Sequence, residues 1–541
     1  MLFYRLRDAL RAAFAADPRT FYVRGYFVLL LLLGLCFYKD YGVSWDEQAD
    51  RTNGMVSARY AVGLVAPNNN FFPNTPDIHG YVENDHGVFF EMPLALLDKV
   101  VFGIEDSRTY FLTRHFAVFV VFMMGVWALY KTARVRFRST RVGLLASTLL
   151  VLSPRFFAES FYNGKDIVFL AFFTLGIYTL VRLLERPTWR RAVVHGLATA
   201  AAVDVRILGI LLVAMTLGML ALEALFGPRE PQRGRRLGQV VPVFLGAAVV
   251  GIYLGWPYLW EAPVRNFLTA FDNMKKFRFI AEVLYMGRRV STLELPWHYA
   301  PVWIVITTPV AYTAAFVLGV LGALAALVRR HLAHLRTFAG RLDILFLGWF
   351  ILPIAMVIVL HSVIYDGWRH LYFVYPALLL LAVRGAGSVW QLGRHYRWAR
   401  PVALGAAVLA GGEMLYTIGR MVQAHPQEQV YFSFLSPAEV ETQFERDYWA
   451  LTYRQGLEWI ARHDPSPQIN VRTTNPGLID NNLAIMKPED RARFRENAPG
   501  KAQYFLGAYR VHPEPYPDSL GNEVYAVKPY GIKALTVLYK W

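Results

Sequence analysis

The feature that most constrains this chain is a series of apolar runs, each long enough or nearly long enough to cross a lipid bilayer. A transmembrane helix needs about 20 mainly apolar residues, so the shorter runs must borrow flanking residues. The runs lie at 24–38, 112–130, 142–158, 166–182, 191–205, 207–226, 238–256, 300–327, 342–361, 371–384 and 400–418. The sequence therefore predicts a polytopic α-helical membrane protein with about eleven transmembrane helices.

Composition and charge agree with this class. Hydrophobic residues make up 55% of the 541 residues, which is too apolar for a soluble protein of this length. The net charge of +16 would suggest a nucleic-acid partner in a soluble chain, but here we assign it to arginine in cytoplasmic loops and expect no nucleic acid. Cys36 is the only cysteine, so neither a disulfide nor a cysteine metal site can form within the chain. Leu35 stands where a lipoprotein signal needs a small residue, so we expect the first run to be retained as a helix.

The distribution of arginine predicts the orientation. Positive residues concentrate in cytoplasmic loops, and here they occur in the N-terminal arm (Arg5, Arg7, Arg11 and Arg19) and in alternate loops at 131–141, 182–191, 227–238, 329–341 and 384–400. We therefore expect a multi-pass protein of the inner (cytoplasmic) membrane with its N-terminus in the cytoplasm. An odd number of helices then places the chain from about residue 419 in the periplasm.

The opposite face carries a different kind of residue. The long first outer loop (39–111) and the outer segments at 153–166, 257–297 and 361–370 mix acidic, basic and aromatic side chains with proline and glycine. Trp45-Asp46-Glu47, just after the first apolar run, is the clearest case. Ionisable groups at the edge of the hydrocarbon are costly unless they serve a site. We infer an enzyme whose substrate arrives at the outer face.

Two domains are expected. Residues 1–418 would form the transmembrane catalytic domain, and residues 419–541 a small periplasmic α/β domain. Within the second, 438–464 has helical periodicity, whereas 467–474, 501–510 and 522–541 are typical of strands separated by turn residues.

Several outer-face motifs resemble those of the GT-C superfamily of membrane glycosyltransferases, close to protein O-mannosyltransferases and lipid A aminoarabinose transferases. Trp45-Asp46-Glu47 occupies the place of the family's acidic motif. The segment 85–97 is similar to the family pattern H-x-x-x-F-E-x-P-P-L in His86, Glu91 and Pro93, and departs from it at Met92 and Leu94. The segments 153–173, 295–309 and 365–376 also resemble bacterial members. The resemblance covers about residues 20–400 and implies interfacial helices in the first outer loop.

The resemblance implies roles for the acidic motif. A transferase that uses a polyprenyl-phosphate sugar needs a base for the acceptor hydroxyl, cations for the departing phosphate, and an apolar groove for the lipid. Asp46 is the expected catalytic base, and Glu47 is expected to hold the acceptor or to orient a neighbour. The alternative is that these residues cap an interfacial helix, because Ser44 and Asp46 are both good N-cap residues.

The remaining candidates divide into phosphate ligands and pocket residues. Fixed cations bind phosphate, and the outer-face candidates for the donor are Arg369, His370, Arg206 and Lys165. The alternative is that Arg206 and Arg369 are snorkelling anchors or pair with Asp204 and Asp366. The expected acceptor or pocket residues are His86, Glu91, Asp166 and Tyr365. Glu83, Asp85 and His86 have a generic spacing for a divalent cation, so no cofactor is assigned.

These observations predict an inverting glycosyltransferase that moves a sugar from a polyprenyl-phosphate donor to a periplasmic protein, lipid or glycan. We assign the 257–297 loop to access of the lipid carrier. One alternative is a ligase or polymerase that uses diphosphate-linked glycans. Another is a lipid or solute transporter, although such proteins place ionisable residues at the midplane and have repeated halves. The sequence indicates neither the sugar, the acceptor nor the oligomeric state.

Overall fold

The structure, a computed structural model, describes residues 17–68, 71–103, 106–275, 280–475, 477–496 and 503–540. Arg5, Arg7 and Arg11 of the predicted cytoplasmic arm, and residues 276–279 of the predicted lipid-access loop, lie outside the described residues.

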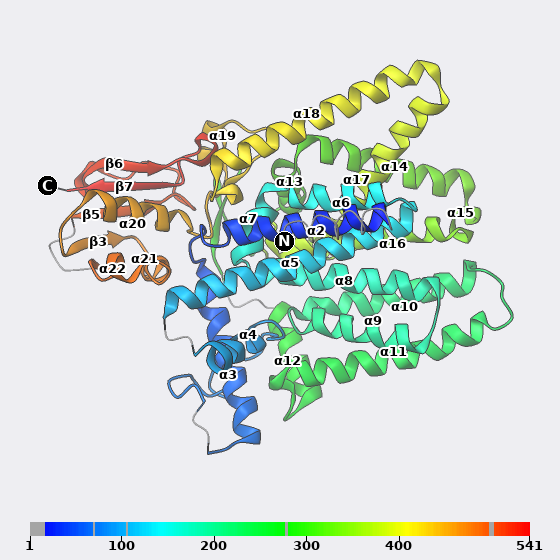
Figure 1. Ribbon diagram of the computed structural model, residues 1–541, viewed down its shortest axis with the longest axis horizontal. Helices are drawn as coiled ribbons and strands as arrows, with labels where there is room; N and C mark the ends of the chain where they lie inside the picture. The colour runs from blue at the N-terminus through cyan, green and yellow to red at the C-terminus, as the bar shows by residue number, and fades with distance from the viewer. Residues whose placement is uncertain are drawn as a thin grey trace, which may run out of the picture.

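Most of the chain is a bundle of long apolar helices (Figure 1). Within the described residues, nine helical segments are long and apolar enough to cross a membrane. A pair of helices that bends by 72° at residues 152–153 brings this number to ten if the pair forms one span. The spanning helices are α2 (Pro18–Phe37), α5 (Ser107–Phe137), the bent pair α6 (Thr140–Val151) and α7 (Pro154–Tyr162), α8 (Asp166–Glu185), η2 (Ile207–Ile210) with α10 (Leu211–Phe226), α11 (Arg233–Gly255), α14 (Val310–Arg330), α16 (Phe338–Val359), η4 (Arg369–Val374) with α17 (Tyr375–His395), and η5 (Arg397–Ala399) with α18 (Arg400–Ala424).

The polytopic helical architecture predicted from the sequence is confirmed, and each predicted apolar run is helical. The difference in number comes from α9 (Trp189–Val203), which has only 15 residues and is too short to span a bilayer without its flanks. The run at 300–327 is interrupted at Thr308-Pro309, so a short helix, α13 (Tyr299–Thr307), precedes α14.

Small residues allow two helices of the bundle to pack closely. A Cβ atom added to Gly319 of α14 would lie 1.9 Å from the carbonyl oxygen of Leu381 in α17. A Cβ atom on Gly385 of α17 would lie 2.0 Å from the carbonyl oxygen of Ala315. Glycine therefore lets the two backbones touch, as is common for helix pairs in membranes.

The first outer loop forms two helices, as the resemblance implies. They are α3 (Trp45–Val65) and α4 (Glu91–Leu97), the latter continuing into η1 (Asp98–Phe102). The predicted lipid-access loop contains η3 (Pro257–Leu259), α12 (Pro263–Lys275) and a hairpin of β1 (Glu282–Tyr285) and β2 (Arg288–Ser291). Trp256, which immediately precedes this loop, is buried among residues of α9 and α12.

The C-terminal part holds a five-stranded sheet of order β4-β3-β5-β7-β6. Strands β4, β3 and β5 are parallel, whereas β5, β7 and β6 are antiparallel. The strands are β3 (Ile469–Thr473), β4 (Phe494–Glu496), β5 (Tyr504–Ala508), β6 (Asn522–Val527) and β7 (Leu535–Tyr539), with helices α20 (Thr452–His463), α21 (Leu478–Leu483) and α22 (Pro488–Arg491).

The helical stretch predicted at 438–464 is in fact two helices. The first, α19 (Pro437–Gln443), is followed by a non-helical segment up to α20. The side chains of Tyr448 and Trp449 in that segment are buried in the same core as the transmembrane helices. The separate core of the sheet begins at Ala450. The gain from burying the two aromatic rings explains why a segment with helical periodicity is not helical here.

The two ends of the bundle differ. In Figure 1 the C-terminal sheet, α3 and α4 lie toward one end of the long helices, and the linkers that follow α8 and α10 lie at the other. The end with these linkers also carries a further short helix, α15 (Leu332–Arg336). We call these the outer and inner ends, following the orientation predicted from arginine.

Candidate active site

The acidic motif begins helix α3 at the outer end of the bundle. Ser44 is the N-cap residue, and the Ser44 backbone N–H donates to the Glu47 carboxylate at 2.7 Å in a capping box. The Glu47 carboxylate thereby satisfies a backbone N–H that a helix start leaves unpaired. The predicted alternative, that this motif caps an interfacial helix, is therefore true of Ser44 and Glu47. It leaves Asp46, the second residue of the helix, available for another role.

Arg369 joins the acidic motif to distant parts of the chain. Its Nη1 donates to Asp46 Oδ2 at 2.9 Å and to Asp166 Oδ2 at 3.2 Å. Its Nε lies 3.4 Å from Asp366 Oδ2. Asp46 and Arg369 are 323 positions apart in the sequence, and the structure places them in direct contact.

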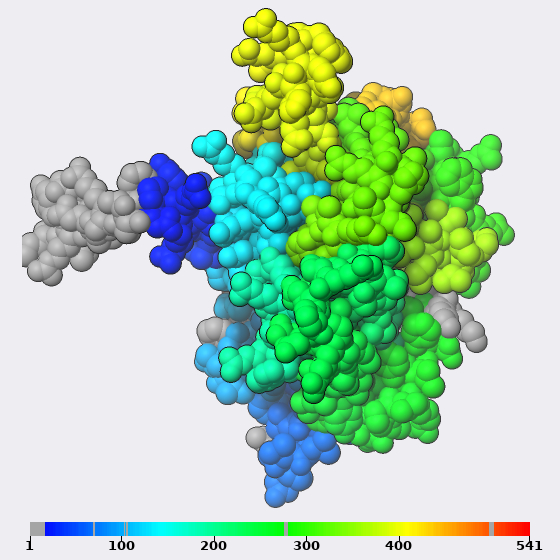
Figure 2. Space-filling model, turned by 90° about the vertical axis from the view of Figure 1, so that its right-hand side faces the viewer, coloured from blue at the N-terminus to red at the C-terminus, as the bar shows by residue number. Residues whose placement is uncertain are grey.

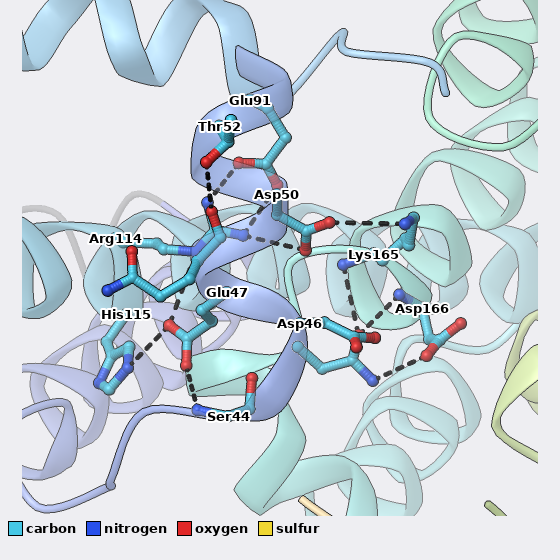
Figure 3. A network of polar contacts seen from close by, with 12 residues as sticks. Ser44, Asp46, Glu47, Asp50, Thr52, Glu91, Arg114, His115, Lys165 and Asp166 are labelled. Atoms are coloured by element: carbon cyan, nitrogen blue, oxygen red, sulfur yellow. Dashed lines mark hydrogen bonds and ion pairs between the residues drawn. The ribbon is translucent and has the colours of Figure 1, made fainter. Parts of the chain in front are cut away.

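Two further cations complete this group. Arg206, at the start of η2, forms an ion pair with Asp166 Oδ1 at 2.5 Å. Lys165, just before α8, lies with its Nζ 3.5 Å from Asp50 Oδ1 of α3. Arg206 does not use the alternative partner Asp204, whose two carboxylate oxygens are buried without a hydrogen bond among the described residues. We call Asp46, Asp50, Lys165, Asp166, Arg206 and Arg369 the outer cluster. Figure 3 labels Asp46, Asp50, Lys165 and Asp166 among them.

A second cluster lies on the other side of α3 in Figure 3. Arg114 of α5 is fully buried and is bonded bidentately by Glu91. The same guanidinium lies 3.3 Å from Asp50 and 3.6 Å from Glu47, and His115 Nε2 lies 3.1 Å from Glu47. These contacts fasten α3 and α4 to the bundle, so they fix the direction of Asp46.

Exposure separates the carboxylates of the outer cluster. The Asp46 side chain is 32% exposed, whereas that of Asp166 is 1% exposed. Burial raises the pKa of Asp46, but Arg369 and Lys165 more than offset this and hold it below its usual value. Asp46 is therefore an ionised carboxylate that a substrate can reach.

The pKa values of Asp50 and Lys165 depend on each other. Burial raises the pKa of Asp50 to about 7, against the effect of the Lys165 and Arg114 cations. Burial lowers the pKa of Lys165, but the carboxylates of Asp50 and Asp46 raise it above its ordinary value. Asp50 therefore changes its charge near neutral pH, and Lys165 remains protonated.

The C-terminal part of the chain contributes to the site. The Arg369 guanidinium carbon lies 4.8 Å from the centre of the Trp449 ring and 4.9 Å from that of Tyr365. Arg510, which follows β5, donates to Asp366. Because Asp366 in turn contacts Arg369, the sheet domain helps to hold the central arginine.

The other predicted residues lie around these clusters. The His370 ring packs 4.7 Å from that of Tyr365. Glu91 is in the Arg114 cluster, and His86 lies on the loop before α4, where its Nδ1 is 3.2 Å from the Glu83 carbonyl oxygen. Among the described residues, no group of three or more His, Cys, Asp or Glu is arranged to hold a metal ion.

Several residues of the site were missed from the sequence, among them Asp50, Arg114 and Trp449. Asp50 follows Asp46 by one helical turn, so the i, i+4 spacing on a predicted helix could have identified it. Arg114 stands inside a predicted transmembrane run, which is itself a functional signal. Trp449 carried no such signal, because its contact depends on how the tail folds back over the bundle.

Comparisons with known proteins agree with this architecture. The sequence model of the family described as dolichyl-phosphate-mannose-protein mannosyltransferase matches residues 111–254. No curated protein sequence matches the chain. The oligosaccharyltransferase of Archaeoglobus fulgidus in its apo form is similar in structure, with a TM-score of 0.50 and 12% identity over 89% of this chain and 69% of that one. ArnT from Cupriavidus metallidurans in the apo state is 13% identical over 95% of this chain and 98% of that one, with a TM-score of 0.49.

The class of protein is therefore defined at the level of the fold. The chain is a multi-pass membrane protein with the GT-C fold of membrane glycosyltransferases, and the resemblance predicted from its outer-face motifs is confirmed. The family match spans three of the six residues of the outer cluster, Lys165, Asp166 and Arg206, and it also includes Arg114 of the second cluster.

Proposed function

We propose that this protein is an inverting glycosyltransferase that takes a sugar from a polyprenyl-phosphate donor and moves it to an acceptor hydroxyl. The observation that carries the proposal is the outer cluster itself. A reachable, ionised carboxylate, Asp46, lies beside fixed cations at the outer end of a GT-C bundle. Phosphate, base and acceptor must meet within a few ångströms for this reaction.

In the proposed reaction Asp46 accepts the proton of the acceptor hydroxyl. The acceptor oxygen attacks the anomeric carbon of the sugar from the face opposite the phosphate. The bond between that carbon and the phosphate oxygen breaks, and its electron pair leaves with polyprenyl phosphate. Inversion follows from a single displacement, and it requires no covalent sugar intermediate.

We assign the donor phosphate first to Lys165 and Arg206. Their side chains are 20% and 17% exposed, whereas that of Arg369 is 4% exposed and is covered by Trp449 and Tyr365. Arg369 already contacts three carboxylates, so we propose that it keeps Asp46 ionised and correctly directed. Contact of Arg369 and His370 with the phosphate stays a prediction. Glu47 is fully buried, and we propose that it positions α3 rather than the acceptor.

The choice of a monophosphate donor rests on the family match. That family is described by its use of dolichyl-phosphate mannose and a protein acceptor, and the matched segment supplies both Lys165 and Arg206. We further propose that the outer end faces the periplasm, because the opposite end carries the arginine-rich loops. Nucleotide sugars are absent from that compartment, so a lipid-borne donor is required.

A second candidate donor is a diphosphate-linked glycan. The name of the structurally similar oligosaccharyltransferase specifies transfer of an oligosaccharide, so a preassembled glycan stays a candidate for the transferred group. Both reactions need the same base and the same inversion at the anomeric carbon, so the outer cluster is compatible with either donor.

The experiment is a transfer assay with the purified protein in lipid nanodiscs. Polyprenyl-phosphate and polyprenyl-diphosphate sugars are offered separately, and the released lipid is identified by mass spectrometry. We expect release of polyprenyl monophosphate from the first donor and inverted stereochemistry in the product. Periplasmic glycoconjugates from cells with and without the gene then identify the sugar and acceptor. The proposal is wrong if neither donor is consumed while lipid or solute moves across the bilayer.

A further inference from the structure

A second polar feature lies at the inner end of the bundle, remote in the fold from the outer cluster. It is a cavity of about 520 Å³. Its walls come from the end of α5, the end of α8, the start of α9, the link between α10 and α11, and the start of α16. Figure 2 looks onto this end of the molecule. Five parts of the chain that are distant in sequence therefore meet around one space.

The cavity is strongly cationic. Its lining includes two carboxylates, Glu185 and Glu230, and six arginines: Arg138, Arg182, Arg186, Arg191, Arg233 and Arg341. A third carboxylate, Glu223, lies buried behind the wall, where it pairs with Arg233 at 2.5 Å and with Arg341 at 2.7 Å. Six guanidinium groups thus face three carboxylates, and the space keeps an excess of positive charge.

The excess positive charge comes from arginines that have no ion-pair partner among the described residues. Arg182 pairs with Glu185 at 2.5 Å, and Arg233 and Arg341 share Glu223. Arg138, Arg186 and Arg191 form no ion pair with any residue that the structure describes. An arginine fork suits phosphate oxygens, so these three groups have donors to offer to an anion.

The cavity also has an apolar part. Leu184 and Phe338 belong to its lining. Leu184 is fully buried, whereas Phe338 is half-buried and is the apolar side chain that an occupant can reach. Leu184 and Phe338 stand at the inner ends of the spanning helices α8 and α16, which is the depth of lipid headgroups. An occupant can therefore place a charged group among the arginines and an apolar chain against the helix ends.

We propose that this cavity binds a phosphate-bearing anion and that its occupant is the headgroup of an anionic phospholipid. Basic pockets between transmembrane helices on the cytoplasmic side bind such headgroups. The bound group would tie α5, α8, α9, α11 and α16 together at the inner end. Free phosphate has the same chemistry, and the experiment separates the two sources.

The test compares two charge-matched double variants of the full-length protein in detergent. The first, Arg138→Gln with Arg186→Gln, removes two lining arginines that have no ion pair among the described residues. The control, Arg141→Gln with Arg190→Gln, removes two exposed arginines near them in sequence that do not line the cavity. The probes are phosphatidylglycerol, phosphatidylcholine and inorganic phosphate. Native mass spectrometry counts the bound molecules. The rise in melting temperature is a second measure of binding, since a ligand that binds only the folded state stabilises it.

We expect phosphatidylglycerol to bind the unchanged protein and the control alike, and to bind the cavity variant about tenfold more weakly. Phosphatidylcholine should show no such difference. A cavity-dependent effect of inorganic phosphate without one of phosphatidylglycerol would keep the anion site but overturn the lipid as its occupant. Equal losses in both variants would show that binding is general surface attraction and would overturn the proposal. None of these outcomes depends on transferase activity.

Discussion

The two ends of the bundle use the same chemistry for different purposes. At the inner end, Asp343 of α16 is bonded by Arg136 through two contacts of 2.8 Å and by Arg384 at 3.1 Å. The Asp343 side chain is 1% exposed, and Arg384 also donates to the carbonyl oxygens of Gly319 and Gly322. At the outer end Asp46 makes one contact with an arginine and stays 32% exposed.

The difference teaches that accessibility, rather than residue type, separates this structural ion cluster from the cluster that we propose to be catalytic. A buried pair adds little net stability, but removing one partner leaves an uncompensated charge and is strongly destabilising. A reachable carboxylate can lose its partner with less damage, because water solvates what remains. Each of the following predictions tests one side of this comparison.

The largest expected effect is that of Asp46→Asn on turnover. Loss of a general base costs roughly 10²–10⁴ in rate, whereas the amide keeps the shape of the side chain. We expect kcat to fall by about that factor with the melting temperature nearly unchanged. Single-turnover assays on the purified variant measure this, with Asp77→Asn, an exposed carboxylate of the same loop, as the control. Normal turnover in Asp46→Asn would remove this residue from the mechanism.

Asp343→Asn should give the opposite result. Arg136 and Arg384 would be left half-paired near the inner end, at a cost of about 3–5 kcal/mol. We expect a large fall in yield and melting temperature, while the kcat of the molecules that remain folded stays close to normal. Thermal unfolding in detergent and active-site titration separate the two quantities. A normal melting temperature with reduced kcat would contradict the structural role.

The sequence was sufficient for the parts of the fold that depend on local pattern. Apolar runs identified every helix that is long and apolar enough to span a membrane, whereas α3 was implied only by the resemblance. Alternation identified the strands at 469–473 and 504–508. Asp46, Asp166 and Arg369 could be singled out because each is an ionisable residue beside an apolar run. The chemistry of the proposed reaction requires these residues to meet in one cluster. Which side chains pair with each other cannot be derived from their spacing in the sequence.

What could not be predicted depends on long-range packing. Arg510 donates to Asp366, which lies 144 positions earlier in the sequence. Trp449 lies against Arg369 only because the segment before α20 is not helical. The inner cavity likewise requires five elements to converge. From the sequence, its arginines indicated only the orientation of the chain in the membrane. That signal depends on how many arginines a loop contains and carries no information on the shape of a cavity.

The cations of the outer cluster should divide between binding and positioning. Arg206→Gln removes a partly exposed cation, and we expect the KM for the donor to rise about 10- to 100-fold, because charge-assisted bonds contribute about 1.5–3 kcal/mol.

Arg369→Lys retains charge but loses the planar fork. It should lower kcat and move the acid limb of the pH–rate profile upward, since the lowered pKa of Asp46 depends on Arg369. If Arg206→Gln left KM unchanged while Arg369→Lys raised it, the two roles would have to be exchanged.

The smallest predicted effect concerns pH and Asp50. Its pKa is about 7, so it is neutral below that pH and charged above it. A charged Asp50 pairs with Lys165 and competes with the donor phosphate for that cation. The donor phosphodiester itself carries one charge throughout this range. We therefore expect the KM for the donor to rise about two- to fivefold between pH 6 and 8, which corresponds to roughly 0.2–1 kcal/mol for a partly exposed ion pair.

Asp50→Asn should abolish this dependence and hold KM at its low-pH value across the range, while Asp77→Asn should retain the dependence. The amide cannot ionise, yet it still fills the space beside Lys165. Initial rates at several donor concentrations and pH values measure the effect, with kcat as an internal reference for the state of Asp46. A KM that rises equally in the native protein and in Asp50→Asn would show that another group titrates. Asp50 would then not compete with the donor phosphate for Lys165, and the pH dependence of KM would not report on the outer cluster's Asp50–Lys165 pair.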